Sequence, residues 1–204
     1  MKYFKNVERL THHRPSLIGM ESCKKVAVCI PLIKAEDGYE VLFEIRSYKI
    51  NSQPGDICFP GGMMEPGETP RETAVREMRE ELLVEASQIQ VLGLMDVLFS
   101  ESNLMMYPYA VILHDYKGTY SKDEVDETFT VPLKFFFETD PQVYQVEAKM
   151  YPDDNFPYEL IHGGRNYKWR KRQESIVFYI YGEYAIWGIT AKVMRSFVGI
   201  MKKL

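Results

Sequence analysis

The sequence has few cysteines, no long hydrophobic run and no excess of positive charge. Three cysteines among 204 residues are too few for a disulfide framework, and their spacing fits no zinc pattern. No apolar run approaches the roughly 18 residues that a membrane-spanning helix needs. Residues 1–16 are polar and lack the apolar core of a signal peptide. We therefore expect a cytoplasmic protein that engages no membrane.

The charge balance argues against a nucleic-acid-binding protein. Lys and Arg number 25 and Asp and Glu number 29, which gives a formal net charge of −4. Such a chain has no basic field that would gather nucleic acid. Residues 167–172 mix cations with aromatics, but this single short run favours a solvated loop or strand edge. We expect an anionic ligand to be bound locally, with the help of a metal ion.

The order of expected elements is mixed rather than strictly alternating. Helices are expected around residues 3–10, from residue 70, and over 190–203, where Val193, Phe197, Ile200 and Met201 form the inner face. Strands are expected at 26–33, 41–45, 56–59, 89–97, 109–113 and 176–181. This order predicts an α/β (α+β) protein with a mixed sheet between helical layers. We expect one domain over residues 1–204, with 1–24 as an extension and 140–175 as an insertion or hairpin.

A loop rich in glycine and proline leads into a helix with clear start signals. Residues 51–68 hold seven Gly and Pro residues, and a long ordered loop of this kind is more often functional than idle. Thr69 is a good N-cap, Pro70 suits the first helical position, and Glu72 completes a capping box. Apolar residues then recur at helical spacing and predict a buried stripe: Ala74, Val75, Met78 and Leu82.

Three glutamates lie beside that stripe. Glu77, Glu80 and Glu81 fall within an arc of roughly 100° on a helix, and repulsion between Glu77 and Glu81 costs a few tenths of a kcal/mol. A hard cation such as Mg²⁺ or Mn²⁺ takes oxygen ligands and would remove this repulsion. The alternative is a solvated charged face stabilised by an Arg76–Glu80 pair. The glycine-rich loop favours the ligand site, because it can bring backbone groups close to phosphate and metal.

From Gly62 onward the sequence resembles the Nudix box, G-x5-E-x7-R-E-U-x-E-E-x-G-U, where U is apolar. Every defining position matches except one, because Leu83 stands where the box has glycine. Leucine in a left-handed cap would cost on the order of 1 kcal/mol. We therefore expect that the helix runs further here or that the turn is built differently. The resemblance implies a Nudix-type α/β/α sandwich and a metal-dependent hydrolase that cuts a phosphoanhydride bond with water.

The resemblance also assigns roles to residues of this segment. Glu77, Glu80 and Glu81 would bind Mg²⁺ or Mn²⁺, and either Glu80 or Glu81 would accept a proton from the attacking water. Glu68 would support the loop or the metal site, and Arg76 would orient the glutamates by ion pairing. Backbone carbonyls of Gly61 and Gly62 would also face the metal. Family members often recruit a further acid from a later loop, and the candidates here are Glu124, Asp126 and Glu127.

Residues upstream of the box are similar to the coenzyme A diphosphatase branch of the family. The similarity includes the pair Arg46-Ser47, Gly55 and the run from Phe59 to Gly62, although Asn51 stands where that branch has an arginine. It implies cleavage of coenzyme A or acyl-CoA to 4′-phosphopantetheine and adenosine 3′,5′-bisphosphate. The implied substrate-binding residues are Arg46, Ser47, Lys49, Phe59, Gly61 and Gly62.

The 3′-phosphate of such a substrate needs a cation, for which Arg46 is the first candidate and Lys49 the second. The alternative is that Arg46 pairs with an acid of its own loop.

Two other functions stay open. A related enzyme would act on ADP-ribose or another nucleoside diphosphate derivative. A non-catalytic Nudix-fold binding domain is favoured by Leu83 alone, since all three box glutamates are present. In each case the expected partner is a small nucleotide-diphosphate molecule rather than a nucleic acid or a membrane, and a homodimer is left open.

Overall fold

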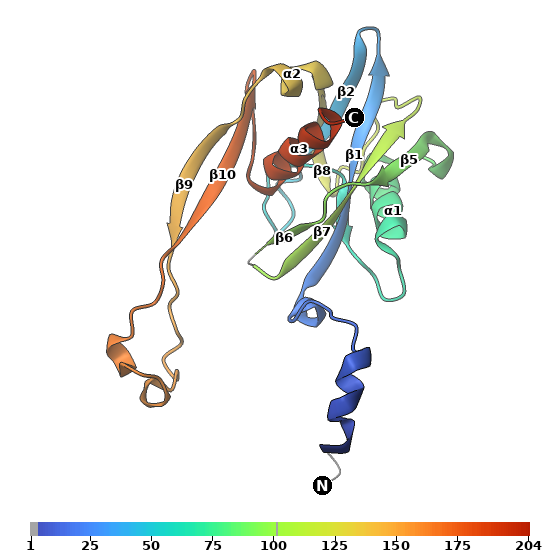
Figure 1. The fold of residues 1–204 in the computed structure, drawn as a ribbon. Helices are drawn as coiled ribbons and strands as arrows, with labels where there is room; N and C mark the ends of the chain where they lie inside the picture. The colour runs from blue at the N-terminus through green and yellow to red at the C-terminus, as the bar shows by residue number, and fades with distance from the viewer. Residues whose placement is uncertain (1–3, 101) are drawn as a thin grey trace.

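A computed structural model describes residues 4–100 and 102–204 (Figure 1). Its centre is an eight-stranded sheet in which β3, β2, β1, β7 and β5 follow one another, while β4 pairs with β1, β6 with β7 and β8 with β2. The strands are β1 (Lys24–Ala35), β2 (Gly38–Arg46), β3 (Ile57–Cys58), β4 (Gly61–Met63), β5 (Ile89–Leu94), β6 (Leu98–Ser100), β7 (Leu104–Leu113) and β8 (Val125–Pro132). β1 runs parallel to β7 and antiparallel to β2 and β4. The predicted mixed sheet is confirmed.

Helices cover both faces of this sheet (Figure 1). Alternate residues of β1 face opposite sides, so that Ala27 and Cys29 pack with helix α1 (Pro70–Leu82). Val28 and Ile30 face the other layer, which contains α2 (Leu133–Glu138) and α3 (Gly188–Met201). The α/β/α sandwich predicted from the sequence is therefore confirmed, with one apolar core on each side of the sheet.

The predicted inner face of the last helix is right in part. Val193 and Phe197 are buried, but Met201 is 37% exposed because the helix ends there, beyond the edge of the core. Three residues absent from the prediction complete the buried face: Ala191, Met194 and Val198.

The start of α1 follows the predicted signals. The Thr69 side chain accepts a hydrogen bond from the Glu72 amide, and the Glu72 carboxylate accepts one from the Thr69 amide at 2.8 Å. Ala74, Met78 and Leu82 are buried against the sheet. Capping fixes where the helix begins, and the apolar stripe fixes which side faces the sheet, so the glutamates beside the stripe are oriented by local sequence.

The end of α1 differs from both alternatives expected there. The helix stops at Leu82, and Leu83 adopts the left-handed conformation with φ 52° and ψ 46°, so the turn has the shape that a glycine would give. The last carbonyl groups of the helix are bonded from a later loop, since Thr119 Oγ1 donates to Leu82 O at 2.7 Å and the Ser121 amide donates to Glu81 O at 2.8 Å. These bonds compensate for the strain at Leu83, whose side chain is 59% exposed.

Replacing Leu83 with glycine is expected to raise the free energy of unfolding by about 0.5–1 kcal/mol, because glycine adopts this conformation without steric cost. The measurement is urea unfolding. Leu83→Ala is the matched control, since alanine keeps the left-handed penalty and should give no comparable gain. Equal stability of the two variants would contradict a strained turn.

Two parts of the chain project from the sandwich (Figure 1). β9 (Gln142–Ala148) and β10 (Arg172–Tyr181) form a long antiparallel ribbon, which β11 (Tyr184–Trp187) extends to three strands. Two short 3₁₀ turns, Tyr158–Leu160 and Gly164–Asn166, lie at the far end of this ribbon. At the N-terminus a 3₁₀ helix spans Phe4–His12 where a helix over 3–10 was predicted, and residue 3 of that prediction lies outside the described residues.

A further 3₁₀ turn at Met20–Ser22 precedes β1, and another at Ala86–Gln88 precedes β5. In the described part of the chain, no helix is both long enough and apolar enough to cross a membrane.

Candidate active site

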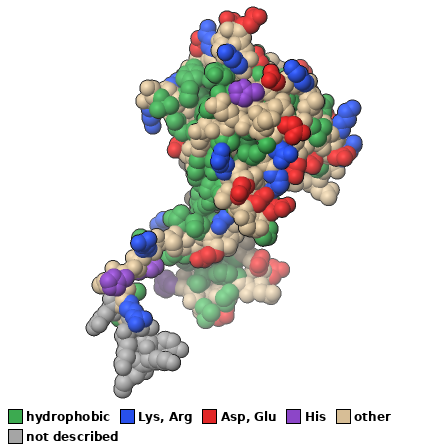
Figure 2. Space-filling model, turned by 90° about the vertical axis from the view of Figure 1, so that its right-hand side faces the viewer, with side chains coloured by type: hydrophobic (Ala, Val, Ile, Leu, Met, Phe, Trp, Pro, Cys, Tyr) green, Lys and Arg blue, Asp and Glu red, His purple; other side chains and the backbone are tan. Residues whose placement is uncertain are grey.

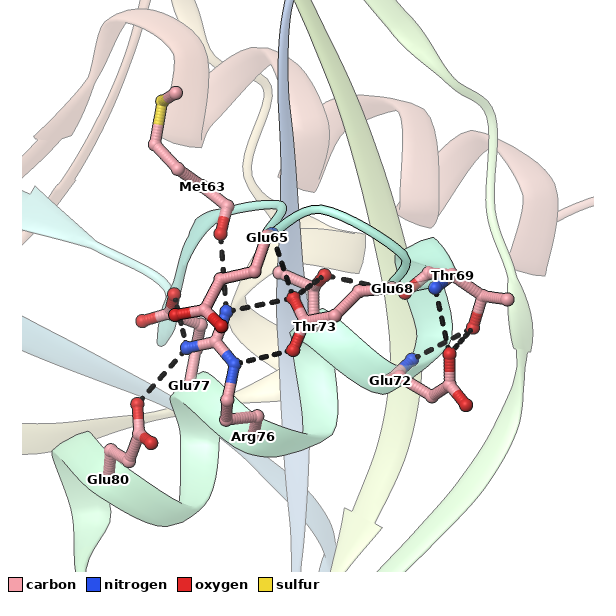
Figure 3. A network of polar contacts seen from close by, with 9 residues as sticks. All are labelled: Met63, Glu65, Glu68, Thr69, Glu72, Thr73, Arg76, Glu77 and Glu80. Carbon is pink, nitrogen blue, oxygen red and sulfur yellow. Dashed lines mark hydrogen bonds and ion pairs between the residues drawn. The ribbon is translucent and has the colours of Figure 1, made fainter.

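Arg76 binds the glycine-rich loop and the acidic face of α1 together (Figure 3). Its guanidinium forms ion pairs with Glu68 at 2.7 Å, Glu77 at 2.8 Å and Glu80 at 3.1 Å. It also donates to the Met63 carbonyl at 3.2 Å. The Arg76 side chain thus holds three parts of the molecule in one arrangement: the loop that follows β4, the start of α1 and two of the three box glutamates. Figure 2 views the molecule from the side on which α1 lies in Figure 1, and acidic and basic side chains lie together there.

Glu68 acts as a brace in this network. Besides Arg76, its carboxylate accepts hydrogen bonds from the Glu65 amide at 3.0 Å and from Thr73 Oγ1 at 2.7 Å. The Arg76 hydrogen bond, followed by that of the Glu65 amide, lowers the pKa of Glu68 from 4.5 to about 2. Glu68 is therefore ionised across the physiological range, and its oxygens are engaged in holding the loop on the helix.

Glu81 differs from the other two box glutamates, because it turns inward. It is 4% exposed, and its carboxylate accepts a hydrogen bond from the Gly61 amide at 2.7 Å. Burial, and then the charge of the nearby Glu44, raise the pKa of Glu81 far above its usual value. By contrast, the Glu80 side chain is 55% exposed and paired with Arg76. The single arc predicted for the three glutamates is thus divided between the sheet-facing and solvent-facing sides of the helix.

The two glycines of β4 allow the close approach of these carboxylates. A methyl group on Gly62 would overlap the carboxylate of Glu77, and one on Gly61 would overlap the backbone of Ala27 and Val28 in β1. Glu77 is half-buried, and burial raises its pKa in spite of the opposing effect of Arg76. The Gly61 amide donates to Glu81 rather than to β1. It is free to do so because only every second residue of an antiparallel strand forms hydrogen bonds with the partner strand. Positions 61 and 62 therefore require glycine, because neighbouring atoms leave no room for a side chain.

Glu44 is a site residue that the sequence interpretation missed. It lies on β2 and is 1% exposed, and its Oε1 accepts a hydrogen bond from Cys58 Sγ at 3.3 Å. Its charge raises the pKa of Glu81. The available signal was one charged residue inside the apolar run Val41–Ile45, since a charge in a buried strand needs a partner or a role.

Of the later acids, the structure brings Glu124 to the site. Its charge acts on Glu44, Glu77 and Glu81. The turn that carries it is held at the end of α1 by the bond from the Ser121 amide to Glu81 O. Glu127 instead accepts a hydrogen bond from the Tyr184 hydroxyl at 2.9 Å. It pairs in register with Ile45, which packs against the core on the α3 side. Asp126 is exposed.

Two of the predicted substrate-binding residues are buried in the structure. Phe59 is 4% exposed and stacks on Phe43 with ring centroids 5.0 Å apart, so it belongs to the core. Ser47 is 2% exposed. Its amide donates to Glu124 O at 2.8 Å and its hydroxyl accepts from the Lys49 amide at 3.3 Å. Both residues shape the site from beneath, because neither side chain reaches solvent.

The cationic candidates lie at the surface. The Arg46 side chain is half-buried, and its Nε donates to the Ser52 carbonyl at 3.2 Å. Its loop partner is thus a carbonyl group rather than the acid that was considered as an alternative. The charge of Arg46 also reaches Glu44 and Cys58. Lys49 is exposed. Arg46 therefore stands at the rim of the acidic group, where a phosphate bound beside a metal could reach it.

The acidic residues fit a hard cation in their chemistry. Within residues 4–100 and 102–204, no three His, Cys, Asp or Glu side chains already converge as a metal-binding group, because Arg76 holds two glutamates and the Gly61 amide holds the third. The donors are nevertheless all oxygens, and several are buried beside like charges. Glu44 Oε2 is buried and has no hydrogen-bond partner in the described structure. A divalent cation would neutralise this repulsion and engage such an oxygen.

Comparison with known proteins gives consistent matches. A family model described as NUDIX domain matches residues 24–153. The chain is 34% identical over 125 residues to the peroxisomal coenzyme A diphosphatase NUDT7 of Mus musculus, which covers 60% of this chain and 52% of that protein. It is 25% identical over 206 residues to Nudix hydrolase 3 of Caenorhabditis elegans, covering 96% of this chain and 81% of that protein.

A third relative is the mitochondrial coenzyme A diphosphatase NUDT8 of Homo sapiens, 26% identical over 172 residues, with 82% of this chain and 65% of that protein covered. The match thus spans about half the length of the mouse protein. Among solved structures, a C. elegans Ap4A hydrolase binary complex aligns with a TM-score of 0.47 at 22% identity, covering 53% of this chain and 80% of that chain.

Proposed function

This chain belongs to the Nudix hydrolase family, and on that basis we propose that it cleaves the diphosphate linkage of coenzyme A or acyl-CoA. The products would be 4′-phosphopantetheine and adenosine 3′,5′-bisphosphate. The observation that carries the proposal is the assembled Arg76 network, which places Glu77 and Glu80 beside the glycine-rich loop while Glu81 faces Gly61. Two relatives of this chain are named as coenzyme A diphosphatases, which supports this substrate.

The acidic residues explain how this chain would cut a phosphoanhydride. Nudix hydrolases generally use divalent metals, and Mg²⁺ or Mn²⁺ held here by Glu77, Glu80, Glu81 and Glu124 would neutralise the diphosphate and acidify water. Of the two glutamates considered as proton acceptor, Glu81 is the better placed, since Arg76 holds Glu80. The Glu81 carboxylate would accept a proton from the attacking water. The water oxygen would then bond to phosphorus, and a phosphate monoester would depart as the leaving group. Arg76 and Glu68 keep the loop and helix in place during this step.

Arg46 is proposed to bind the 3′-phosphate, and two substrates test it. Arg46→Ala is expected to raise KM for coenzyme A by about 10–100-fold, the loss of one charge-assisted hydrogen-bonded pair. KM for 3′-dephospho-coenzyme A should change little, because it lacks that phosphate. Steady-state kinetics with both substrates measure the difference. Lys49→Ala is the matched control, and a larger effect there than at Arg46 would transfer the role to Lys49.

A panel of substrates distinguishes coenzyme A from the alternative substrates, ADP-ribose or another nucleoside diphosphate derivative. Each substrate is incubated with Mg²⁺ or Mn²⁺ and the products are identified by mass spectrometry. Rapid ADP-ribose cleavage with inert coenzyme A would contradict the substrate proposed here.

The structure removes the one argument for a non-catalytic binding domain, which was the replacement of the box glycine by Leu83. Leu83 keeps the left-handed turn and leaves Glu81 in place. The cytoplasmic location and a homodimer stay predictions, and two relatives carry peroxisomal and mitochondrial names.

A further inference from the structure

Glu44 lies on the floor of the acidic site. Residues of β2 alternate between the two faces of the sheet, and Leu42 packs with the core beneath α1. Glu44 shares that face, two residues further along the strand. Its neighbours in register are Cys58 of β3 and Thr128 of β8. The carboxyl group of Glu44 therefore points toward the layer in which α1 ends, where Glu81 turns inward.

The Glu44 carboxyl group is only half satisfied by the protein. Cys58 Sγ donates to Oε1 at 3.3 Å, which is a weak hydrogen bond. Oε2 has no partner among the described residues although the side chain is 1% exposed. A buried carboxylate oxygen without a partner is strongly unfavourable, and such atoms in native proteins call for an explanation, of which a bound ion is one.

The charges around Glu44 point to a cation. Glu81, Glu77 and Glu124 all interact with it repulsively. Arg46 is the favourable charge, but its Nε is directed to the Ser52 carbonyl. Burial and these acids raise the pKa of Glu44 above its usual value. Four carboxylates thus share a region in which Arg46 is partly engaged and Arg76 is paired with Glu77. A divalent ion at this place would compensate for the remaining negative charge.

We propose that Glu44 is a ligand of the divalent ion of this site, binding through Oε2 from the sheet while Glu81 binds from the helix. The inference rests on the proposed function, because it assigns a further ligand to the metal which that function needs. The competing explanation is structural: Glu44 would be a neutral acid whose role is the hydrogen bond with Cys58. These two roles respond differently to glutamine, which keeps the size and an acceptor for Cys58 but has no anionic oxygen.

Manganese binding to the metal-free, full-length protein tests the proposal. Free Mn²⁺ is followed by electron paramagnetic resonance during titration, so that no turnover is needed. Glu44→Gln is expected to weaken Mn²⁺ binding at least about 10-fold. Glu40→Gln is the matched control, since Glu40 lies on the same strand and face and bonds Thr130 at 2.6 Å, and its affinity should match wild type. Cys58→Ala, which removes the hydrogen bond alone, should also bind Mn²⁺ with wild-type affinity.

The outcomes separate this inference from the proposed function. Wild-type affinity in Glu44→Gln, or an equal loss in Cys58→Ala, would overturn the ligand role while leaving the hydrolase in place. Absence of Mn²⁺ binding by the wild-type protein would overturn both. Circular dichroism confirms that each variant folds. If the amide variant does not fold, Glu44→Asp serves instead: it keeps the charge but withdraws the oxygens by one methylene, and weaker Mn²⁺ binding is again expected.

Discussion

Replacing Glu81 with glutamine is expected to lower kcat by at least about 100-fold, because the variant loses both a metal ligand and the proposed proton acceptor. The same change should make the metal-free protein harder to unfold. Glu81 is 4% exposed and lies beside the charge of Glu44, so its carboxylate is unfavourable in the folded state without a cation. Glutamine has the same size and removes that charge. Activity and stability are thus predicted to move in opposite directions.

The stability gain should depend on pH in a definite direction. The folded-state pKa of Glu81 is raised above 4.5, so the native state binds a proton that the unfolded chain releases. The contribution of Glu81 to stability is complete below about pH 4.5 and is lost as pH rises toward the folded pKa. Glu81→Gln avoids this loss. The gain over wild type should therefore grow from pH 5 to pH 8 and reach on the order of 1–3 kcal/mol.

Urea unfolding in chelator at pH 5 and pH 8, together with kcat for coenzyme A, measures both effects. Glu85→Gln is the control, because Glu85 is an exposed acid just beyond α1 whose side chain is 81% exposed. It should change neither quantity appreciably. Unchanged turnover in Glu81→Gln would show that the active site lies elsewhere. Lower stability of the metal-free variant at pH 8 would show that the protein itself stabilises this carboxylate.

Local sequence was sufficient to predict α1, and contacts between distant segments were not predictable. The capping box of Thr69 and Glu72 fixes the helix start through neighbouring residues, so the pattern carries the information. The inward turn of Glu81 depends on β4, since the Gly61 amide lies 20 positions earlier in the chain. Helical spacing places three glutamates in one arc, but the position of the sheet decides which of them is buried.

Other features of the candidate site depend on distant contacts in the same way. Phe59 lies within the glycine-rich loop and was predicted to bind substrate, and in the structure it packs on Phe43 of the neighbouring strand. Glu44 was passed over because its burial depends on β3 and β8 pairing on either side of β2. Leu83 departed from the family pattern, and the compensating bonds come from Thr119 and Ser121. In each case the decisive neighbour is remote in sequence.

Gly62→Ala is expected to lower kcat/KM for coenzyme A by about 10–100-fold, since displacement of a catalytic group by about 1 Å can have an effect of this size. The added methyl group would overlap the Glu77 carboxylate, which Arg76 holds at 2.8 Å. Arg76 also forms an ion pair with Glu68 and a hydrogen bond with the Met63 carbonyl. Movement of Glu77 would therefore disturb this whole network of polar contacts. Stability is expected to fall by no more than about 1 kcal/mol, because the strand accepts alanine and the ion pairs that are disturbed are partly exposed.

A double-mutant cycle with Glu77→Ala identifies the cause of that loss. If the methyl group acts by displacing the Glu77 carboxylate, Gly62→Ala should have little further effect on kcat/KM once that carboxylate is gone. Additive losses would mean that the methyl group acts elsewhere, for instance directly on the substrate. Gly199→Ala in α3 is the control, because a methyl group there meets nothing within 4 Å. It should stabilise the helix by up to about 1 kcal/mol and leave kcat/KM unchanged. Strong coupling of Gly62 to Glu77, with no effect at Gly199, would show that glycine is needed in β4 because a larger residue would displace the Glu77 carboxylate.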